Sequence, residues 1–165
     1  MDFVAVPEDR VGAVIGKNGE NKKALEKRFS VKIEVDENRI GIDGEPLNAL
    51  KVREIVTAIG RGFSPERALL LDDEENILEA MDLSDLSENA RERMRSRIIG
   101  AEGKAKSQME SMTGTSISVL GKSVSIIGRP SDVAIAKEAI SMLVGGASHG
   151  AVYSMISKKR KDESW

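Results

Sequence analysis

The sequence predicts an α+β protein that contains the unit β-α-α-β-β-α twice. The first observation is an internal repeat: when the 165-residue sequence is shifted by 84 positions, Gly16 falls on Gly100 and Gly19 on Gly103 without a gap. The second is that Gly-x-x-Gly lies between two helix-like stretches in each copy. The third is that alternating apolar residues follow each second stretch, which is typical of half-buried strands.

The register of the repeat holds well beyond the glycines. Ile33 falls on Ile117, and Pro46 falls on Pro130. Two glycines coincide easily by chance, but a match through strands, turns and proline does not. We therefore expect both copies to adopt one fold.

Each element expected in the first copy has a local reason. Pro7 ends a short apolar run, and acidic residues open the next helix, where the helix dipole favours them. Leu25 and Phe29 share a helix face, and Pro46 suits the first turn of the last helix. The expected elements are a strand at 3–6, helices at 8–15 and 20–29, strands at 31–35 and 40–42, and a helix from 46 lined by Val52, Ile55, Val56 and Ile59.

The second copy repeats this order. We expect a strand at 77–83, helices at 88–99 and 104–112, strands at 117–119 and 124–127, and a last helix lined by Val133, Ala136, Ile140 and Leu143. Each unit should have a three-stranded sheet with helices packed on one face. The expected domains are a first unit at 1–62, an acidic linker at 63–76, a second unit at 77–146, and a short C-terminal helix with a basic tail at 147–165.

Composition narrows the class of protein. Apolar residues make up 40% and charged residues 32%, as in globular domains. There is no cysteine, which excludes disulfides and thiolate metal sites. The N-terminus lacks the pattern of a signal peptide, and no apolar run reaches the roughly 18 residues of a membrane span. We therefore expect a cytoplasmic protein that does not enter a membrane.

The net charge of −2 hides an uneven distribution. Residues 61–86 contain 2 basic and 8 acidic residues, whereas residues 87–145 contain 9 basic and 6 acidic ones. Local charge rather than the total governs contact with a polyanion. The second half is therefore more basic than the whole-chain value indicates.

The segment VGAVIGKNGENKK places Gly16-Lys17-Asn18-Gly19 between two helices. One interpretation is a simple turn in which glycine supplies a positive φ. Another is a nucleotide-binding P-loop, which requires G-x-x-x-x-G-K-[ST]. The P-loop is disfavoured, because Gly12 and Gly16 are one residue too close and residue 18 has no hydroxyl for magnesium.

The third interpretation is the type I K-homology (KH) module, whose Gly-x-x-Gly loop clamps about four nucleotides of a single strand. Glycines let the backbone approach the sugar-phosphate chain, and the following helix presents N–H groups to phosphate. The fold would then be two tandem type I KH domains. The RNA-binding candidates are the two loops and their flanking residues: Ile15, Gly16, Lys17, Asn18, Gly19, Lys22, Lys23, Lys32, Arg97, Ile99, Gly100, Ala101, Glu102, Gly103, Lys104 and Lys106.

Four segments make the resemblance more specific: VPEDRVGAVIGKNG, IGRGFSPERALLL at 59–71, RSRIIGAEGK and the tail HGAVYSMISKKRK. Over essentially the whole chain, the sequence resembles the archaeal KH-domain proteins of small-subunit ribosome assembly, which are related to the eukaryotic Krr and partner-of-Nob proteins. The resemblance implies binding of single-stranded RNA in the 3′ region of small-subunit ribosomal RNA. It also implies two protein partners: the endonuclease that trims that end, and the alpha subunit of the initiation factor that delivers initiator tRNA.

The second loop departs from the pattern of the first, because Glu102 places a carboxylate where Asn18 stands in the first loop. We expect the surrounding basic residues to compensate. Those residues are Arg91, Arg93, Arg95 and Arg97 before the loop, and Lys104 and Lys106 after it.

The remaining features favour no catalysis. His149 is the only histidine, and no nucleophile and base lie at motif spacing, so we expect neither an enzyme nor a metal or cofactor site. The acidic run 72–75 is interpreted as a solvated linker, with contact to a basic protein partner as the alternative. The basic run 158–161 is interpreted as either a tail or an rRNA contact. Two functional hypotheses remain: RNA binding through both loops, or a protein scaffold that uses one unit for a protein partner.

Overall fold

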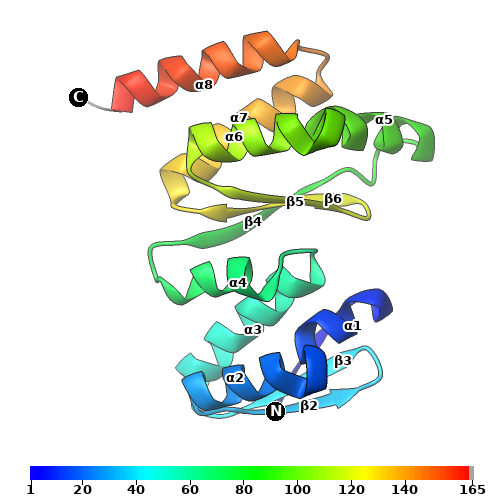
Figure 1. The fold of residues 1–165 in the computed structure, drawn as a ribbon, viewed down its shortest axis with the longest axis vertical. Coiled ribbons are helices and arrows are strands. Elements are labelled where there is room, and N and C mark those ends of the chain that lie inside the picture. The colour runs from blue at the N-terminus through cyan, green and yellow to red at the C-terminus, as the bar shows by residue number, and fades with distance from the viewer. Residues whose placement is uncertain (164–165) are drawn as a thin grey trace. The chain divides into compact units, whose positions relative to one another are not determined.

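The computed structural model describes residues 1–163 and divides into two compact units between Glu74 and Glu75 (Figure 1). Both units have a three-stranded antiparallel sheet, and the order β-α-α-β-β-α occurs in each. The predicted α+β class and element order are therefore confirmed.

The first unit has the sheet order β1-β3-β2, so that β1 and β2 are the edge strands. Its core is aliphatic, with Val14 of α1 and Ile40 of β3 fully buried among the side chains of α3. The elements are β1 (Asp2–Ala5), α1 (Glu8–Ile15), the 3-10 turn η1 (Lys17–Gly19), α2 (Glu20–Phe29), β2 (Lys32–Asp36), β3 (Arg39–Asp43) and α3 (Pro46–Gly60).

The second unit has the equivalent order β4-β6-β5. Figure 1 shows its helices on one side of the sheet, with α8 as the outermost layer. The elements are β4 (Ile77–Asp82), α5 (Glu88–Ile99), the 3-10 turn η3 (Ala101–Gly103), α6 (Lys104–Thr113), β5 (Ser116–Leu120), β6 (Ser123–Gly128), α7 (Pro130–Val144) and α8 (His149–Glu163).

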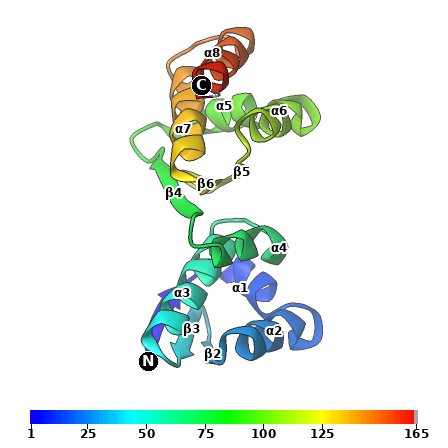
Figure 2. The same cartoon turned by 90° about the vertical axis from the view of Figure 1, so that its left-hand side faces the viewer.

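Most of the segment expected to be an acidic linker is packed instead. Residues 65–72 form α4 (Pro65–Ala68) and the 3-10 turn η2 (Leu69–Asp72), which lie against α3 (Figure 2). Phe63, Ala68 and Leu71 are at most 1% exposed. The composition of this segment is acidic, but its apolar residues form part of the first unit, so only the residues after Asp72 resemble a linker.

The basic run at the C-terminus also differs from a free tail, because it lies within α8. Val152 and Ile156 are fully buried, so the helix is docked by its apolar face. Arg160 pairs with Asp132 of α7, and Lys159 lies 3.9 Å from Glu138. Arg160 and Lys159 therefore contact α7 from within this run.

The repeat continues into these two segments. Ser64 caps α4 by accepting a hydrogen bond from Arg67 N at 3.2 Å, and Ser148 caps α8 by accepting one from Ala151 N at 3.1 Å. The two serines are 84 residues apart, as are the fully buried Ala68 and Val152. Each copy thus ends in a serine-capped helix, short in the first unit and long in the second.

Two further features concern membrane-spanning helices and metal-binding groups of side chains. No helix within residues 1–163 is long and apolar enough to cross a membrane. The same residues contain no group of three or more histidine, aspartate or glutamate side chains that could hold a metal ion.

If α8 is part of the second unit, then Ile156→Ala should destabilise that unit. A fully buried isoleucine truncated to alanine loses about 2–5 kcal/mol of unfolding free energy. Hydrogen exchange of α6 and α7 amides should show this loss, with α1 to α3 unchanged. The exposed Lys158→Ala variant is the control, and equal exchange in both variants would contradict docking of α8.

Candidate nucleic-acid interface

The first Gly-x-x-Gly loop turns sharply between α1 and α2. Gly16 has φ +78° and ψ 171°, a conformation essentially restricted to glycine. A Cβ at Gly16 would lie 2.8 Å from the backbone N of Asn21. Asn18 and Gly19 follow in the left-handed region, with φ +56° and +73°. The chain can therefore make this turn only with glycine at position 16.

The second loop has the same geometry. Gly100 has φ +76° and ψ 175°, and its Cβ would lie 2.8 Å from Ala105 N. Glu102 has φ +55°, close to the value at Asn18. In contrast, a Cβ at Gly103 would meet nothing within 4 Å, and one at Gly19 would meet only the end of Lys23 at 3.8 Å. The first glycine of each loop is packed, and the second faces open space.

Only part of each loop offers unpaired amides. Gly16 N donates to Gly12 O at 2.8 Å, and Gly19 N donates to Gly16 O at 3.1 Å. The amides of the two glycines are therefore not available to a ligand. Within residues 1–163, the amides of Lys17 and Asn18 have no backbone acceptor. The equivalent groups in the second loop are those of Ala101 and Glu102.

The first loop carries unpaired positive charge. Lys17 and Lys23 are exposed, and neither forms an ion pair with any residue that the structure describes. Lys22 instead pairs with Glu26 at 3.5 Å, and Lys32 with Glu34 at 3.5 Å. Four lysines of the first unit were predicted to contact RNA. Of these, Lys17 and Lys23 are the two without an ion-pair partner among the described residues. Ile15, also predicted, is half-buried beside the loop.

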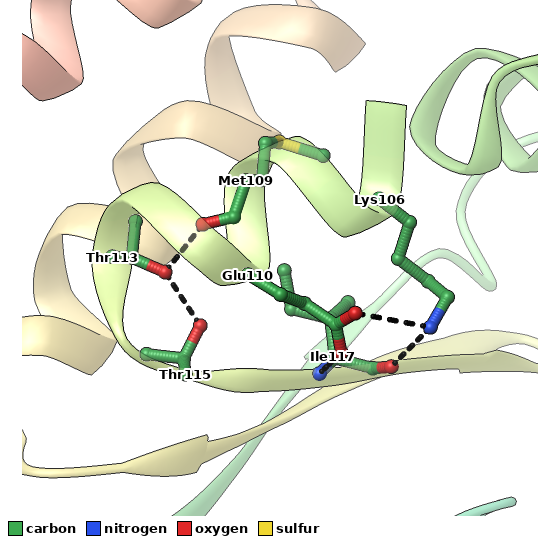
Figure 3. A network of polar contacts seen from close by, with 6 residues as sticks. All are labelled: Lys106, Met109, Glu110, Thr113, Thr115 and Ile117. Carbon is green, nitrogen blue, oxygen red and sulfur yellow. Dashed lines mark hydrogen bonds and ion pairs between the residues drawn. The ribbon is translucent and has the colours of Figure 1, made fainter. Parts of the chain in front are cut away.

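The second loop has less unpaired positive charge than the sequence predicted. Lys104 lies 4.0 Å from Glu102, so the loop carboxylate faces the nearest cation. Lys106 lies 3.5 Å from Glu110 and donates to Ile117 O at 3.3 Å (Figure 3). Both predicted lysines therefore have partners within the unit.

Three of the four arginines before the second loop donate hydrogen bonds to backbone carbonyls of their own unit. Arg97 donates to Ala147 O at 2.7 Å, where it supports the turn into α8. Arg91 donates to Leu86 O at 2.7 Å, and Arg95 donates to Gly121 O at 2.6 Å. In the described part of the chain, Arg93 is the one member of this group without such a contact. These contacts hold three of the four guanidinium groups in place, and sequence spacing does not reveal them. The half-buried Ile99 completes this loop.

Sequence reasoning missed a pair of glutamates beside the loops. Glu26 accepts a hydrogen bond from Ile33 N at 2.9 Å, and Glu110 accepts one from Ile117 N at 2.8 Å (Figure 3). Both bonds tie the helix after the loop to the edge strand β2 or β5. The sequence did contain an indication of this pair, because Glu26 falls on Glu110 in the repeat.

Comparisons with known proteins agree with this geometry. Residues 77–161 match the family model described as "Eukaryotic type KH-domain (KH-domain type I)", and residues 2–58 match the model described as "KH domain". A KH domain-containing protein of Methanocaldococcus jannaschii is 44% identical, over 98% of this chain and 74% of its own. The Pre-rRNA-processing protein PNO1 of Chaetomium thermophilum is 30% identical, over 86% of this chain but only 58% of its own.

A solved structure is also similar along the whole chain. It is an a/eIF2alpha-aDim2p-rRNA complex from Pyrococcus horikoshii, in which the matched chain has a TM-score of 0.91 and 44% identity, with 98% of this chain and 94% of that chain covered. The fold and the two loops define the protein as a KH-domain protein. It belongs to the PNO1/Dim2 family.

The two glycines of the first loop should tolerate substitution differently. Gly16→Ala should lower the unfolding free energy of the first unit by roughly 3 kcal/mol, because both its backbone conformation and the contact with Asn21 become strained. Gly19→Ala should lower the unfolding free energy by only about 1–2 kcal/mol, because alanine is disfavoured by that amount in the left-handed conformation. Urea unfolding followed through α1 and α2 amide signals would measure both. Equal losses of unfolding free energy in the two variants would contradict the close packing of Gly16 against Asn21.

Proposed function

We propose that this chain is a non-catalytic RNA-binding factor of pre-ribosomal RNA processing, with two tandem type I KH domains that bind single-stranded RNA in the 3′ region of small-subunit rRNA. Its relatives support the proposal: one is named as a pre-rRNA-processing protein, and the Pyrococcus structure contains rRNA. The chemistry of the loops supports the same class of ligand.

The observation that carries the proposal is the arrangement at residues 17–19. Two amides without backbone acceptors lie beside Lys17 and Lys23, and Gly19 leaves the approach open. Backbone N–H groups at the start of a helix suit phosphate, and lysine adds full charge without demanding a particular base. The first loop is thus equipped to hold the backbone of a strand.

The two loops are not equivalent as phosphate-binding sites. The second has the same backbone, but Glu102 places a carboxylate beside Lys104, and Arg97 and Lys106 are engaged within the unit, which reduces its attraction for a polyanion. We therefore assign the larger share of RNA affinity to the first unit.

The same observation favours a second candidate function for the second unit, namely contact with a protein. The alpha subunit of the initiation factor is the best-supported partner, because a/eIF2alpha is present in the Pyrococcus complex. The endonuclease that trims the rRNA 3′ end is a further proposed partner. Such a unit would act as a scaffold beside an RNA-binding one.

Substitution of the second glycine in each loop tests the unequal roles. Aspartate tolerates the left-handed conformation, so the fold should survive, while its carboxylate repels phosphate. Gly19→Asp should lower affinity for a 3′-terminal small-subunit rRNA fragment by roughly tenfold or more, which is about 1.4 kcal/mol. Gly103→Asp should have a smaller effect. Filter binding with each variant provides the measurement.

Circular dichroism of both variants is the control for folding. Unchanged RNA affinity in Gly19→Asp would exclude the first loop as a contact. A larger loss in Gly103→Asp would reverse the assignment of the two units.

Salt dependence tests the part played by lysine. Each phosphate contact to a single strand contributes a slope of about −0.7 to log K against log salt. Lys17→Ala should therefore make the slope about 0.7 less negative, whereas Lys22→Ala, which removes a lysine already paired with Glu26, should change it less. Equal slopes in wild type and Lys17→Ala would place this lysine outside the interface.

A further inference from the structure

The basic run at the end of α8 is divided between two sides of the helix. Lys159 and Arg160 form ion pairs with carboxylates of α7. Lys158 and Lys161 are three residues apart, so they share a face, and both line a depression in the surface of α8. Lys158 is exposed and has no ion pair or hydrogen bond with any residue that the structure describes. Part of the run is therefore not used by the fold.

Hydroxyl groups lie beside these two lysines. The α8 depression has a volume of about 430 Å³ and is lined by Tyr153, Ser154, Ser157, Lys158 and Lys161. Within residues 1–163, none of its three hydroxyls forms a hydrogen bond, whereas Thr57 and Thr113 of other helices donate to the carbonyl four residues earlier at 2.7 Å. The described lining thus offers hydroxyl and ammonium donors and includes no carboxylate.

The corresponding positions of the first copy have the opposite charge. In the repeat, Ser157 falls on Asp73, and Lys158 falls on Glu74. Carboxylates at these positions repel an anion, whereas a hydroxyl and an ammonium group attract one. The shared fold therefore does not require donors at these positions, and the α8 depression is a property of the second copy.

The donors of the α8 depression suit phosphate better than a protein surface. Lysine, serine and tyrosine side chains are among the groups that donate to the phosphate oxygens of a nucleic acid strand. The fully buried core of a protein interface is mostly apolar. None of the described residues that line the depression is a leucine, isoleucine, valine or methionine. The chemistry therefore favours a phosphodiester chain.

The position of α8 is also suitable for a strand that crosses the second Gly-x-x-Gly loop. Its first residue, His149, has Nε2 2.8 Å from Arg97 O, and Gly100 follows Arg97 by three residues. The helix packs against α6, which begins directly after the loop (Figure 1). From His149 to Lys158 the helix rises about 14 Å, a length that about four stacked nucleotides span.

We propose that the α8 depression is an additional phosphate-binding site for the RNA strand, outside both loops. Lys158 and Lys161 supply positive charge that the second loop lacks. The hydroxyls of the depression donate to the phosphate oxygens. The inference rests on the proposed RNA-binding function and adds a contact to it. Because phosphates are the same in every sequence, this site contributes affinity without base preference.

A salt titration of two neighbouring lysine variants tests the site. Lys158→Ala removes a lysine of the depression, and Lys159→Ala removes the next exposed lysine, which lies 3.9 Å from Glu138. Near about 0.15 M salt, Lys158→Ala should weaken binding of the 3′-terminal rRNA fragment about threefold, and should make the slope of log K against log salt about 0.7 less negative. Lys159→Ala should change both values less than half as much. Poly-uridine of equal length should show the same loss, because a phosphate contact does not depend on sequence.

Tyr153 provides a second readout, because it is the only tyrosine in the chain. Its ring NMR signals should shift with the rRNA fragment and saturate with the binding curve. Tyr153→Phe keeps a ring to pack against the core of the second unit and removes the hydroxyl. This variant should fold normally and weaken RNA binding roughly twofold or more.

Comparison with Gly19→Asp separates this inference from the proposed function. If Gly19→Asp weakens RNA binding but Lys158→Ala matches Lys159→Ala in affinity and salt slope, the α8 site is wrong and the first loop stands. If Lys158→Ala alone weakens binding, α8 is the contact and the first loop is not. Unchanged affinity in both variants would overturn both proposals.

An oligoglutamate probe tests an acidic protein as the occupant. Lys158→Ala should weaken RNA binding more than it weakens binding of oligoglutamate. The reverse order would assign the α8 depression to an acidic protein segment and contradict the phosphate site.

Discussion

The close contact between Gly16 and the backbone of Asn21 is the constraint on which the first unit's site depends. Because glycine has no Cβ, the chain can turn abruptly from α1 into α2 there, and within residues 1–163 the turn leaves the amides of Lys17 and Asn18 without backbone acceptors. Asn21 reinforces the turn, since its side-chain amide donates to Val14 O at 2.8 Å. Gly100 meets Ala105 in the same way. The proposed binding surface is thus a consequence of helix packing.

The two units share the same backbone fold but differ in electrostatics. In the first unit, Lys17 and Lys23 remain available, and α2 is left partly uncovered. In the second, basic side chains beside the loop are committed to carbonyls and carboxylates, and α8 covers α6. A duplicated fold has therefore separated into one loop suited to a polyanion and one whose neighbouring charges support its own structure.

Much of this architecture could be predicted from sequence because the repeat doubles every local signal. The alternation at Ile33 and Val35 and the stop at Pro7 predicted their elements correctly. The segment 63–72 was mispredicted because its acidic composition outweighed the buried Phe63 and Leu71. The partners of Arg97 could not be predicted, since Ala147 is distant in sequence. Charge counts describe what a segment contains, whereas tertiary contacts decide which charges remain available.

The most direct test of the account is an NMR titration of the amide signals of residues 16–19 with the 3′-terminal rRNA fragment. If the outward amides hold phosphate, then the signals of Lys17 and Asn18 should shift strongly and saturate with the binding curve. Those of Gly16 and Gly19, already bonded within the chain, should shift less. Strong binding that leaves Lys17 and Asn18 unmoved would contradict the claim that this backbone holds the strand.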